Sequence, residues 1–234
     1  MKLSVRDLNS YYGPAHVLFD AALDVGEGEA VALLGRNGAG KSTTFRSIVG
    51  LVARRTGRIL FEGRDISNLP THAIVRGGLG YVPEERRIFT DLTVEENLEV
   101  GRQPARSGAP QWTRERLFDL FPNLAEMRSR PGGRMSGGEQ QMLTIARTLM
   151  GNPSLVLLDE PSEGLSPRIV EQMVEAILTM KKEGVSLLVS EQNLHFARLI
   201  SDRAYIMERG RMCFSGTMTE LDVNPDIRDA HLAL

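Results

Sequence analysis

The stretch from Gly35 to Ser42, Gly-Arg-Asn-Gly-Ala-Gly-Lys-Ser, constrains the fold of this 234-residue chain more than any other segment. It matches the pattern G-x-x-x-x-G-K-[ST] and lies between a short apolar run at 29–34 and a helical pattern that begins at Lys41. Glycines there let several backbone N–H groups face one phosphate, and the helix N-terminus adds its dipole. We therefore expect a strand, a phosphate-binding loop and a helix in that order. A glycine-rich turn with a chance Lys-Ser pair is the plain alternative, and the flanking elements argue against it.

The roles within this loop follow from the chemistry of phosphates. Lys41 is expected to reach the β- and γ-phosphates of a nucleoside triphosphate, and the Ser42 hydroxyl to ligate Mg²⁺. The predicted nucleotide-binding residues of the loop are Gly35, Asn37, Gly38, Ala39, Gly40, Lys41, Ser42 and Thr43. By itself the loop indicates a nucleoside triphosphatase and no particular kind.

A second apolar run, Leu155 to Leu158, ends in two carboxylates, Asp159 and Glu160. A strand end beside the phosphate loop is where a carboxylate that supports Mg²⁺ belongs, so we assign that role to Asp159. Glu160 is then placed to polarise the attacking water as general base. A strand that runs out into a solvated acidic turn is the alternative, which the upstream phosphate loop disfavours.

The order of strand and helix patterns predicts an α/β fold with a mainly parallel sheet covered by helices. Strand patterns lie at 3–8, 21–25, 29–34, 58–61, 155–158 and 185–189. A helix with a 3.6-residue apolar stripe is expected from Ser166-Pro167 to Gly184. Between Thr93 and Met150 the pattern is mostly helical, which suggests a helical insertion in the α/β core.

Composition limits the partners and the compartment. The net charge of −2 gives no global basic field that would point to nucleic acid. No apolar run approaches the ~20 residues needed to span a bilayer, so work at a membrane requires docking on a partner that spans it. A single cysteine, Cys213, rules out an internal disulfide, fits a reduced intracellular compartment, and is expected in the core.

The segment Met135 to Gln141, Met-Ser-Gly-Gly-Glu-Gln-Gln, opens another predicted helix. Ser136 and Glu139 form the capping box S-x-x-E, but a capping box does not require two glycines in the first turn, where they weaken a helix. Exposed N–H groups on such a turn suit an anionic ligand. Here the sequence resembles the ABC ATPase family, whose signature is LSGGQ, with Met in place of Leu and Glu in place of Gln.

The resemblance implies a P-loop NTPase of ABC type that binds ATP and Mg²⁺. It implies one domain over residues 1–234: a RecA-like core, an N-terminal antiparallel β-subdomain, and an α-helical subdomain inserted at approximately 86–150. It also implies an ATP-sandwich dimer, in which the signature of one subunit contacts the γ-phosphate held by the phosphate loop of the other. The signature residues concerned are Ser136, Gly137, Gly138 and Glu139.

Three further positions are compared with the family. Tyr12 matches the aromatic residue that stacks on adenine, although a turn tyrosine packed on the first strands explains it equally well. Glu84 occupies the position of a Gln that senses the γ-phosphate and Mg²⁺, and it brings an extra negative charge there. Gln192 stands where most members carry a switch His; it can hydrogen-bond the γ-phosphate through its amide but cannot shuttle a proton, so proton abstraction rests on Glu160.

Four segments together narrow the resemblance: 81–89, 92–98, 135–141 and 191–193. They look like the smaller ATP-binding subunit of high-affinity branched-chain amino acid importers, and the urea and short-chain amide importers are similar. This implies a different ATPase subunit as partner (or a homodimer in isolation), transmembrane permease subunits, and indirectly a periplasmic binding protein. The implied location is the cytoplasmic face of the inner, or plasma, membrane. A non-transport ABC ATPase of cofactor assembly stays open, whereas Glu160 argues against a binding module without turnover.

Overall fold

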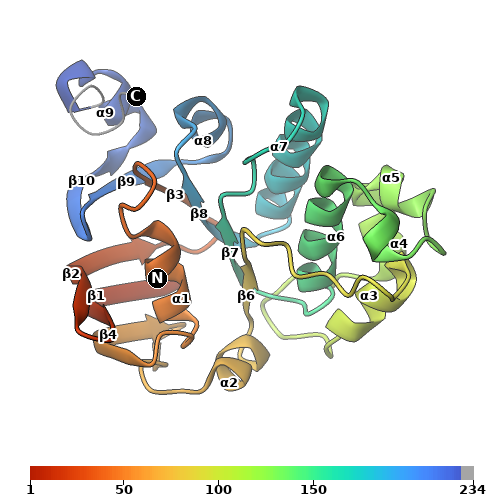
Figure 1. The fold of residues 1–234 in the computed structure, drawn as a ribbon, viewed down its shortest axis with the longest axis horizontal. Coiled ribbons are helices and arrows are strands. Elements are labelled where there is room, and N and C mark those ends of the chain that lie inside the picture. Colours follow the sequence, from red (N-terminus) through yellow and green to blue (C-terminus); the bar gives the residue numbers. More distant parts are fainter. Residues whose placement is uncertain (228–234) are drawn as a thin grey trace.

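Short apolar strands form the centre of the molecule (Figure 1). The structure is a computed structural model and describes residues 1–227 of the chain. The central strands are β3 (Ala30–Leu34), β6 (Leu79–Val82), β7 (Leu155–Asp159), β8 (Ser186–Glu191), β9 (Arg203–Glu208) and β10 (Arg211–Thr217). They form a six-stranded sheet in the order β10-β9-β3-β8-β7-β6, parallel except for the pair β9–β10. Every residue of β3, β7 and β8 is buried, as expected for parallel strands covered on both faces. The predicted α/β class with a mainly parallel core is confirmed.

A second sheet is antiparallel and contains the first strands of the chain (Figure 1, red to orange). Its strands are β1 (Leu3–Tyr12), β2 (Ala15–Val25), β4 (Arg54–Phe61) and β5 (Arg64–Asp65), in the order β2-β1-β4-β5. The first two strands are longer than predicted, because they meet in a tight hairpin that pairs Tyr12 with Ala15. Gly13 adopts a φ of 56° in this turn, a conformation that glycine takes without strain. The predicted N-terminal antiparallel β-subdomain is therefore present.

The helix α1 (Lys41–Ile48) lies between the two sheets (Figure 1). Its side chains Phe45 and Ile48 are fully buried and belong to one apolar cluster with Val31 of β3 and Leu157 of β7. Because α1 begins at Lys41, this packing also fixes the loop that precedes the helix.

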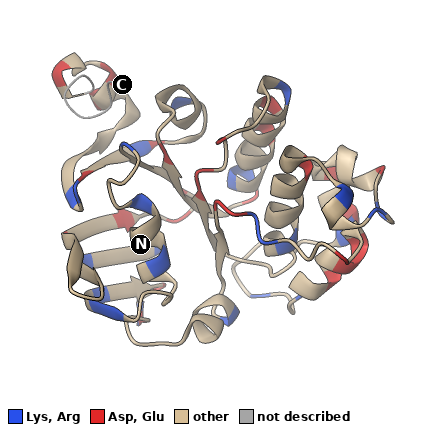
Figure 2. Ribbon diagram, in the orientation of Figure 1, with Lys and Arg blue, Asp and Glu red and all other residues tan. Residues whose placement is uncertain are grey.

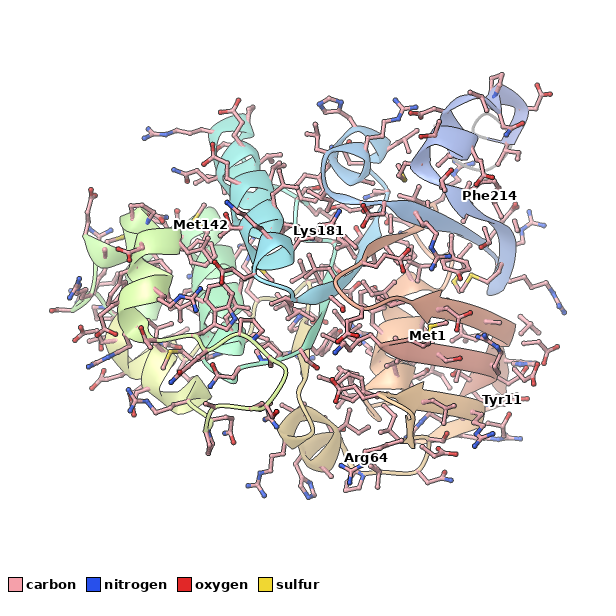
Figure 3. The ribbon with its side chains drawn as sticks, turned by 180° about the vertical axis from the view of Figure 1, so that it is seen from behind. Met1, Tyr11, Arg64, Met142, Lys181 and Phe214 are labelled. Atoms are coloured by element: carbon pink, nitrogen blue, oxygen red, sulfur yellow. The ribbon has the colours of Figure 1, made fainter. Side chains whose placement is uncertain are left out.

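The helices that follow β6 form the end of the molecule away from the antiparallel sheet (Figure 1, green). They are α3 (Val94–Gly101), α4 (Arg114–Leu120), α5 (Pro122–Ala125), a short 3₁₀ turn at Gly132–Arg134, and α6 (Gly137–Leu149); α2 (Thr71–Arg76) precedes β6. Met142 and Ile145 of α6 are fully buried and share an apolar cluster with Leu98 of α3 and Phe118 of α4. Figure 3, seen from behind, shows Met142 among the side chains at this end of the molecule.

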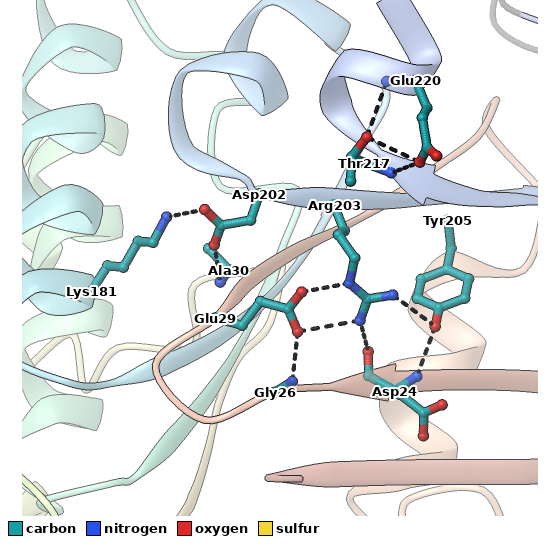
Figure 4. Close-up of polar contacts among 10 residues, drawn as sticks. All are labelled: Asp24, Gly26, Glu29, Ala30, Lys181, Asp202, Arg203, Tyr205, Thr217 and Glu220. Atoms are coloured by element: carbon teal, nitrogen blue, oxygen red, sulfur yellow. Dashed lines mark hydrogen bonds and ion pairs between the residues drawn. The ribbon is translucent and has the colours of Figure 1, made fainter.

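Behind the sheet, α7 (Pro167–Lys182) carries the predicted apolar stripe, with Met173 and Ile177 fully buried. Leu178, the residue after Ile177, is 42% exposed. Lys181 on its last turn pairs with Asp202 Oδ1 at 2.6 Å, and Asp202 Oδ2 accepts from the Ala30 N–H at 3.0 Å (Figure 4). This contact ties the end of α7 to the start of β3. The remaining helices are α8 (Leu194–Ile200) and α9 (Met218–Asp222).

A polar cluster around Arg203 connects the two sheets (Figure 4). The Arg203 guanidinium contacts both carboxylate oxygens of Glu29, at 2.5 and 3.2 Å, and donates to the Asp24 carbonyl at 3.0 Å. Tyr205 Oη accepts from the Asp24 N–H at 3.1 Å. Since Asp24 is the second-last residue of β2 and Arg203 begins β9, the cluster fixes the antiparallel sheet against the parallel one.

The sequence also led to expectations about the burial of Cys213 and about membrane-spanning segments. Cys213 was expected in the core, and this is wrong: it is exposed on β10, an edge strand that alternates between exposed and half-buried residues. Within residues 1–227, no helix combines the length and the apolar composition needed to cross a membrane. Residues 228–234 of the predicted domain lie outside the described part.

Candidate functional site

The loop Gly35–Ser42 joins β3 to α1 and is shaped by two close approaches. Any residue larger than glycine at position 35 would bring its Cβ into collision with the Met207 carbonyl oxygen on β9. At position 40 the added Cβ would lie 2.9 Å from a Leu18 methyl carbon. Gly40 has a φ of 115° and precedes the first turn of α1. No side chain caps this helix and its first turn holds no acid, so its first N–H groups stay open to an anion.

Lys41 is buried in this loop and held by three acceptors. Its Nζ donates to the Gly35 and Arg36 carbonyls at 2.7 and 3.3 Å and pairs with Glu160 Oε1 at 3.0 Å. Lys41 is 3% exposed and Glu160 is 7% exposed, so both charges have left water. Each is tolerated because the other is present, and removing one partner of such a pair is destabilising.

Asp159 ends β7 and accepts three side-chain hydrogen bonds. Ser190 Oγ donates to Asp159 Oδ1 at 2.6 Å, Ser42 Oγ to the same oxygen at 3.1 Å, and Tyr81 Oη to Oδ2 at 3.2 Å. Burial raises the pKa of Asp159, and these three hydrogen bonds oppose that rise only in part. The structure therefore brings Ser42 and Asp159, predicted from separate motifs, into direct contact.

Glu160 follows in a left-handed backbone conformation, with a φ of 46°. That conformation is costly for a residue with a side chain and persists where the surroundings hold it. Here the Glu160 N–H donates to the Ser190 carbonyl at 3.1 Å and to Ser190 Oγ at 3.0 Å. The Gln192 amide lies 3.5 Å from Glu160 Oε2 and donates to it. Gln192, expected to face the γ-phosphate, thus contacts the predicted base in this structure.

A cavity of about 450 Å³ opens over the loop. It brings together most of the residues predicted from the phosphate loop and adds the carboxylates of Glu84 and Glu160. Its walls are Val17, Asn37, Gly38, Ala39, Gly40, Lys41, Ser42, Thr43, Glu84, Glu160 and Glu163. A cavity of about 480 Å³ beside Trp112 is slightly larger, but it holds neither the loop nor an acid. The loop cavity is therefore the candidate nucleotide site.

Acidic side chains crowd one side of this cavity. Burial raises the pKa of Glu84, and the nearby charges of Glu160 and Asp159 raise it further. The hydrogen bond with Glu160 and then burial raise the pKa of Glu163 to about 7. Figure 2 shows red ribbon gathered at the carboxyl ends of the central strands. A polyphosphate entering here must be accompanied by positive charge.

The side chains of Ser42, Asp159 and Glu84 are chemically suited to bind a magnesium ion. A serine hydroxyl and a carboxylate are hard oxygen ligands, and Mg²⁺ commonly takes one or two carboxylates together with substrate phosphates. Ser42 and Glu84 line the cavity, and Ser42 Oγ lies 3.1 Å from Oδ1 of the fully buried Asp159. Within residues 1–227, no group of three or more His, Cys, Asp or Glu side chains is placed to hold a metal by itself.

The predicted signature residues lie elsewhere. Ser136 Oγ accepts from the Glu139 N–H at 3.4 Å and Glu139 Oε2 accepts from the Ser136 N–H at 2.7 Å, so the capping box is formed. Within residues 1–227, the N–H groups of Gly137 and Gly138 have no acceptor. None of these four residues lines the cavity that contains Lys41. The α6 N-terminus is thus a second, separate set of open donors.

Tyr12 stands at the end of β1 and is 46% exposed. It is not a wall of the loop cavity. Its assignment to adenine stacking remains a prediction.

Four residues of the site were missed by sequence reasoning. Ser190 and Tyr81 hold Asp159, Glu163 lines the cavity, and Glu191 is buried and accepts from the Ser162 N–H at 3.1 Å. Glu163 carried a local signal, because a third carboxylate three residues after Glu160 falls within the same turn, and its N–H bonds the Glu160 carbonyl at 3.2 Å.

Comparison with known proteins agrees with this geometry. Residues 18–163 match the family model of the ABC transporter. BraG of Pseudomonas aeruginosa, a high-affinity branched-chain amino acid transport ATP-binding protein, is 44% identical over 98% of this chain and 99% of its own length. LptB of Haemophilus influenzae, a lipopolysaccharide export system ATP-binding protein, is 36% identical over 98% of this chain and 96% of its own.

Solved structures share the fold. A nucleotide-free ATP-binding cassette from an ABC transporter has a TM-score of 0.82 at 26% identity and covers 97% of this chain and 96% of its own. A cassette in its ADP conformation has a TM-score of 0.80 at 26% identity, covering 95% of this chain and 93% of its own. The chain therefore belongs to the ABC transporter family, as the subunit that binds and hydrolyses ATP.

Proposed function

We propose that this chain powers an importer of branched-chain amino acids, closing with a second ATPase subunit around ATP and reopening after hydrolysis. Two relatives support the substrate class: BraG, at 44% identity, and a probable branched-chain amino acid transport ATP-binding protein, LivF of Archaeoglobus fulgidus, at 37% identity over 92% of this chain.

The observation that carries the paired arrangement is the separation of two sets of open N–H donors. One set is the first turn of α1 at the cavity of Lys41, and the other is the first turn of α6 at Gly137 and Gly138. A site made by one chain uses only the first set. Two chains placed head to tail would bring the second set of each onto the nucleotide held by the other, giving two composite sites.

The contacts of Lys41 suggest how ATP activates its own hydrolysis. In the structure the Lys41 ammonium is neutralised by Glu160, so the predicted base is tied up at 3.0 Å. Triphosphate oxygens compete for Lys41 with a greater negative charge. When Lys41 turns to them, Glu160 is released from the ion pair, keeps its contacts with Gln192 and Glu163, and becomes free to accept a proton from the attacking water.

Ser42 and Asp159 would hold Mg²⁺, which neutralises phosphate charge and orients the reacting end. Glu84 faces the same cavity as a third oxygen donor and would sense whether the ion is there. Without a cation its carboxylate repels the phosphates, so its orientation depends on the nucleotide state.

The proposed partners are transmembrane permease subunits, a second ABC ATPase subunit (this chain itself when isolated) and, indirectly, a periplasmic binding protein. The proposed place of action is the cytoplasmic face of the inner or plasma membrane. ATPases of urea or short-chain amide import, of lipopolysaccharide export, and of cofactor assembly are the competing assignments.

Uptake by reconstituted vesicles tests the proposal. The chain is combined with candidate membrane subunits and a candidate binding protein. Uptake of labelled leucine is then measured in vesicles whose lumen contains both this subunit and ATP. We expect ATP-dependent accumulation that is lost with Lys41→Ala. Transport of urea or an amide with no leucine uptake would move the chain to the similar importers, and ATPase activity without any uptake would contradict the import function.

A further inference from the structure

Arg86 occupies an unusual place beside the first turn of α6. A Cβ at Gly137 would lie 2.5 Å from Arg86 Nη1 and 3.1 Å from its Cζ, so the guanidinium rests directly against the Gly137 backbone. Arg86 lies in the coil between β6 and α3, which is red and then blue in Figure 2. Two distant segments therefore meet at the signature.

The coil holds Arg86 in that position. Arg86 and Arg87 both have positive φ, 62° and 48°, which is uncommon for residues with side chains. The Arg86 carbonyl accepts from Thr144 Oγ1 at 2.7 Å and the Arg87 carbonyl from Arg147 Nη2 at 2.6 Å. Thr144 and Arg147 are both on α6. The backbone at Arg86 is thus attached to the helix that carries the signature.

The charge of Arg86 has no acidic partner among residues 1–227. Glu85, the nearest acid in sequence, already pairs with Arg46 at 2.8 Å and lies 3.7 Å from Arg87. Within residues 1–227, the Arg86 guanidinium has neither an ion pair nor a hydrogen bond. The planar guanidinium of an arginine next to open N–H groups is suited to a multiply charged oxyanion such as a phosphate.

Glu139 makes such a cation necessary. It places a carboxylate on the same turn, where it accepts from the Ser136 N–H at 2.7 Å. A phosphate approaching Gly137 and Gly138 would be repelled by this charge unless a cation offset it. Arg86 is the cation in contact with that turn.

We propose that Arg86 is a phosphate-contacting residue that acts in trans: in the closed dimer its guanidinium binds the γ-phosphate of ATP held by the partner chain. The inference rests on the proposed ATP-sandwich dimer and adds a residue to it. It makes Arg86 specific to dimer closure, whereas Lys41 binds ATP in the single chain.

ATP-driven dimerisation tests this role. In a Glu160→Gln background, sedimentation velocity measures the dimer fraction against ATP concentration. Adding Arg86→Gln should raise the ATP concentration for half-dimerisation by about tenfold or more, the factor expected for one charge-assisted contact. Arg86→Lys should recover part of the loss. Arg87→Ala, which changes the neighbouring exposed arginine, is the matched control and should have no effect.

ATP binding to the single chain helps to distinguish a failure of the proposed dimer from a failure of the proposed role of Arg86. At protein concentrations where the chain is monomeric, a fluorescent ATP analogue should bind Arg86→Gln and its parent equally. A parent that does not dimerise with ATP would overturn the sandwich and the role of Arg86 with it. A parent that dimerises while Arg86→Gln matches it, or dimerises more readily, would overturn the role of Arg86 alone.

Mixed dimers identify the chain on which Arg86 acts. One tagged chain carries Lys41→Ala, so ATP occupies only the partner's loop. Arg86→Gln on the Lys41→Ala chain should weaken ATP-dependent pairing, while the same change on the ATP-holding chain should have little effect. The reverse pattern would show that Arg86 serves its own nucleotide and would refute action in trans.

Discussion

Replacing Ser190 by alanine removes the shortest hydrogen bond to the Asp159 carboxylate. Ser190 Oγ donates to Asp159 Oδ1 at 2.6 Å and accepts from the Glu160 N–H at 3.0 Å, and the residue is fully buried. The N–H keeps the Ser190 carbonyl at 3.1 Å, so the main loss is the bond to the carboxylate. A hydrogen bond to a charged, buried group contributes about 1.5–3 kcal/mol, so we expect Ser190→Ala to lower the free energy of unfolding by about 2 kcal/mol.

Ser186→Ala is the matched control on the same strand. Ser186 is equally buried, but its Oγ accepts from the neutral Gly28 N–H at 2.9 Å. Losing that bond should lower the free energy of unfolding by about 1 kcal/mol or less. Thermal unfolding without nucleotide, followed by circular dichroism at pH 7.5, measures both variants. A chain of this size shifts by about 2–4 °C per kcal/mol, so the melting temperature should fall by about 4–8 °C for Ser190→Ala and about half that for Ser186→Ala.

The comparison refutes the reasoning if the two variants lose the same stability. Equal losses would mean that the charge of Asp159 is not what makes the Ser190 bond strong. A stability gain in Ser190→Ala would also refute it, because the hydrogen bond from Ser190 would then not stabilise the buried carboxylate.

Three further variants test the loop, the acidic wall and the pH response. Lys41→Ala should weaken ATP binding by about tenfold or more, because Nζ is a charged donor to phosphate, and unchanged affinity in titration calorimetry would show that the loop is misassigned. Glu84→Gln should retain most of the ATPase turnover, since the amide keeps an oxygen for the cation and removes a repelling charge; a large loss would give the carboxylate a role of its own. Burial raises the pKa of Glu62, but hydrogen bonds from Ser154 and Lys2 outweigh it and leave the pKa below the ordinary 4.5. Stability from Glu62 is therefore present above pH 4.5 and lost as pH falls through the lower folded-state pKa, so Glu62→Gln should destabilise at pH 7 and match the parent at acidic pH in urea titrations.

Much of the fold and of the site could be predicted because their signals are local. The loop Gly35–Ser42 needs glycine where its backbone approaches Met207 and Leu18, and these glycines appear in the sequence at the spacing of the motif. The capping box of Ser136 and Glu139 lies within four residues, and the structure forms it as predicted. Short runs of four to six mainly apolar residues indicated the buried strands for the same reason.

Other features depend on which strands become neighbours. Ser190 lies beside Asp159 because β7 pairs with β8 in the register that matches these two residues. The pair between Lys41 and Glu160 joins positions more than a hundred residues apart, and neither motif alone implies it. The prediction for Cys213 was wrong because a short apolar segment has the same sequence pattern in a central strand and in an edge strand.

The oligomeric state of Glu160→Gln with ATP tests the composite site most directly. Light scattering during gel filtration should show a monomer without nucleotide and a dimer with saturating ATP, because the nucleotide is bound and is not hydrolysed. ATP turnover should fall by about a hundredfold or more, the contribution of a general base. The double variant Lys41→Ala, Glu160→Gln should stay monomeric. A Glu160→Gln chain that remains monomeric at saturating ATP, or hydrolyses ATP at the parent rate, would contradict the account.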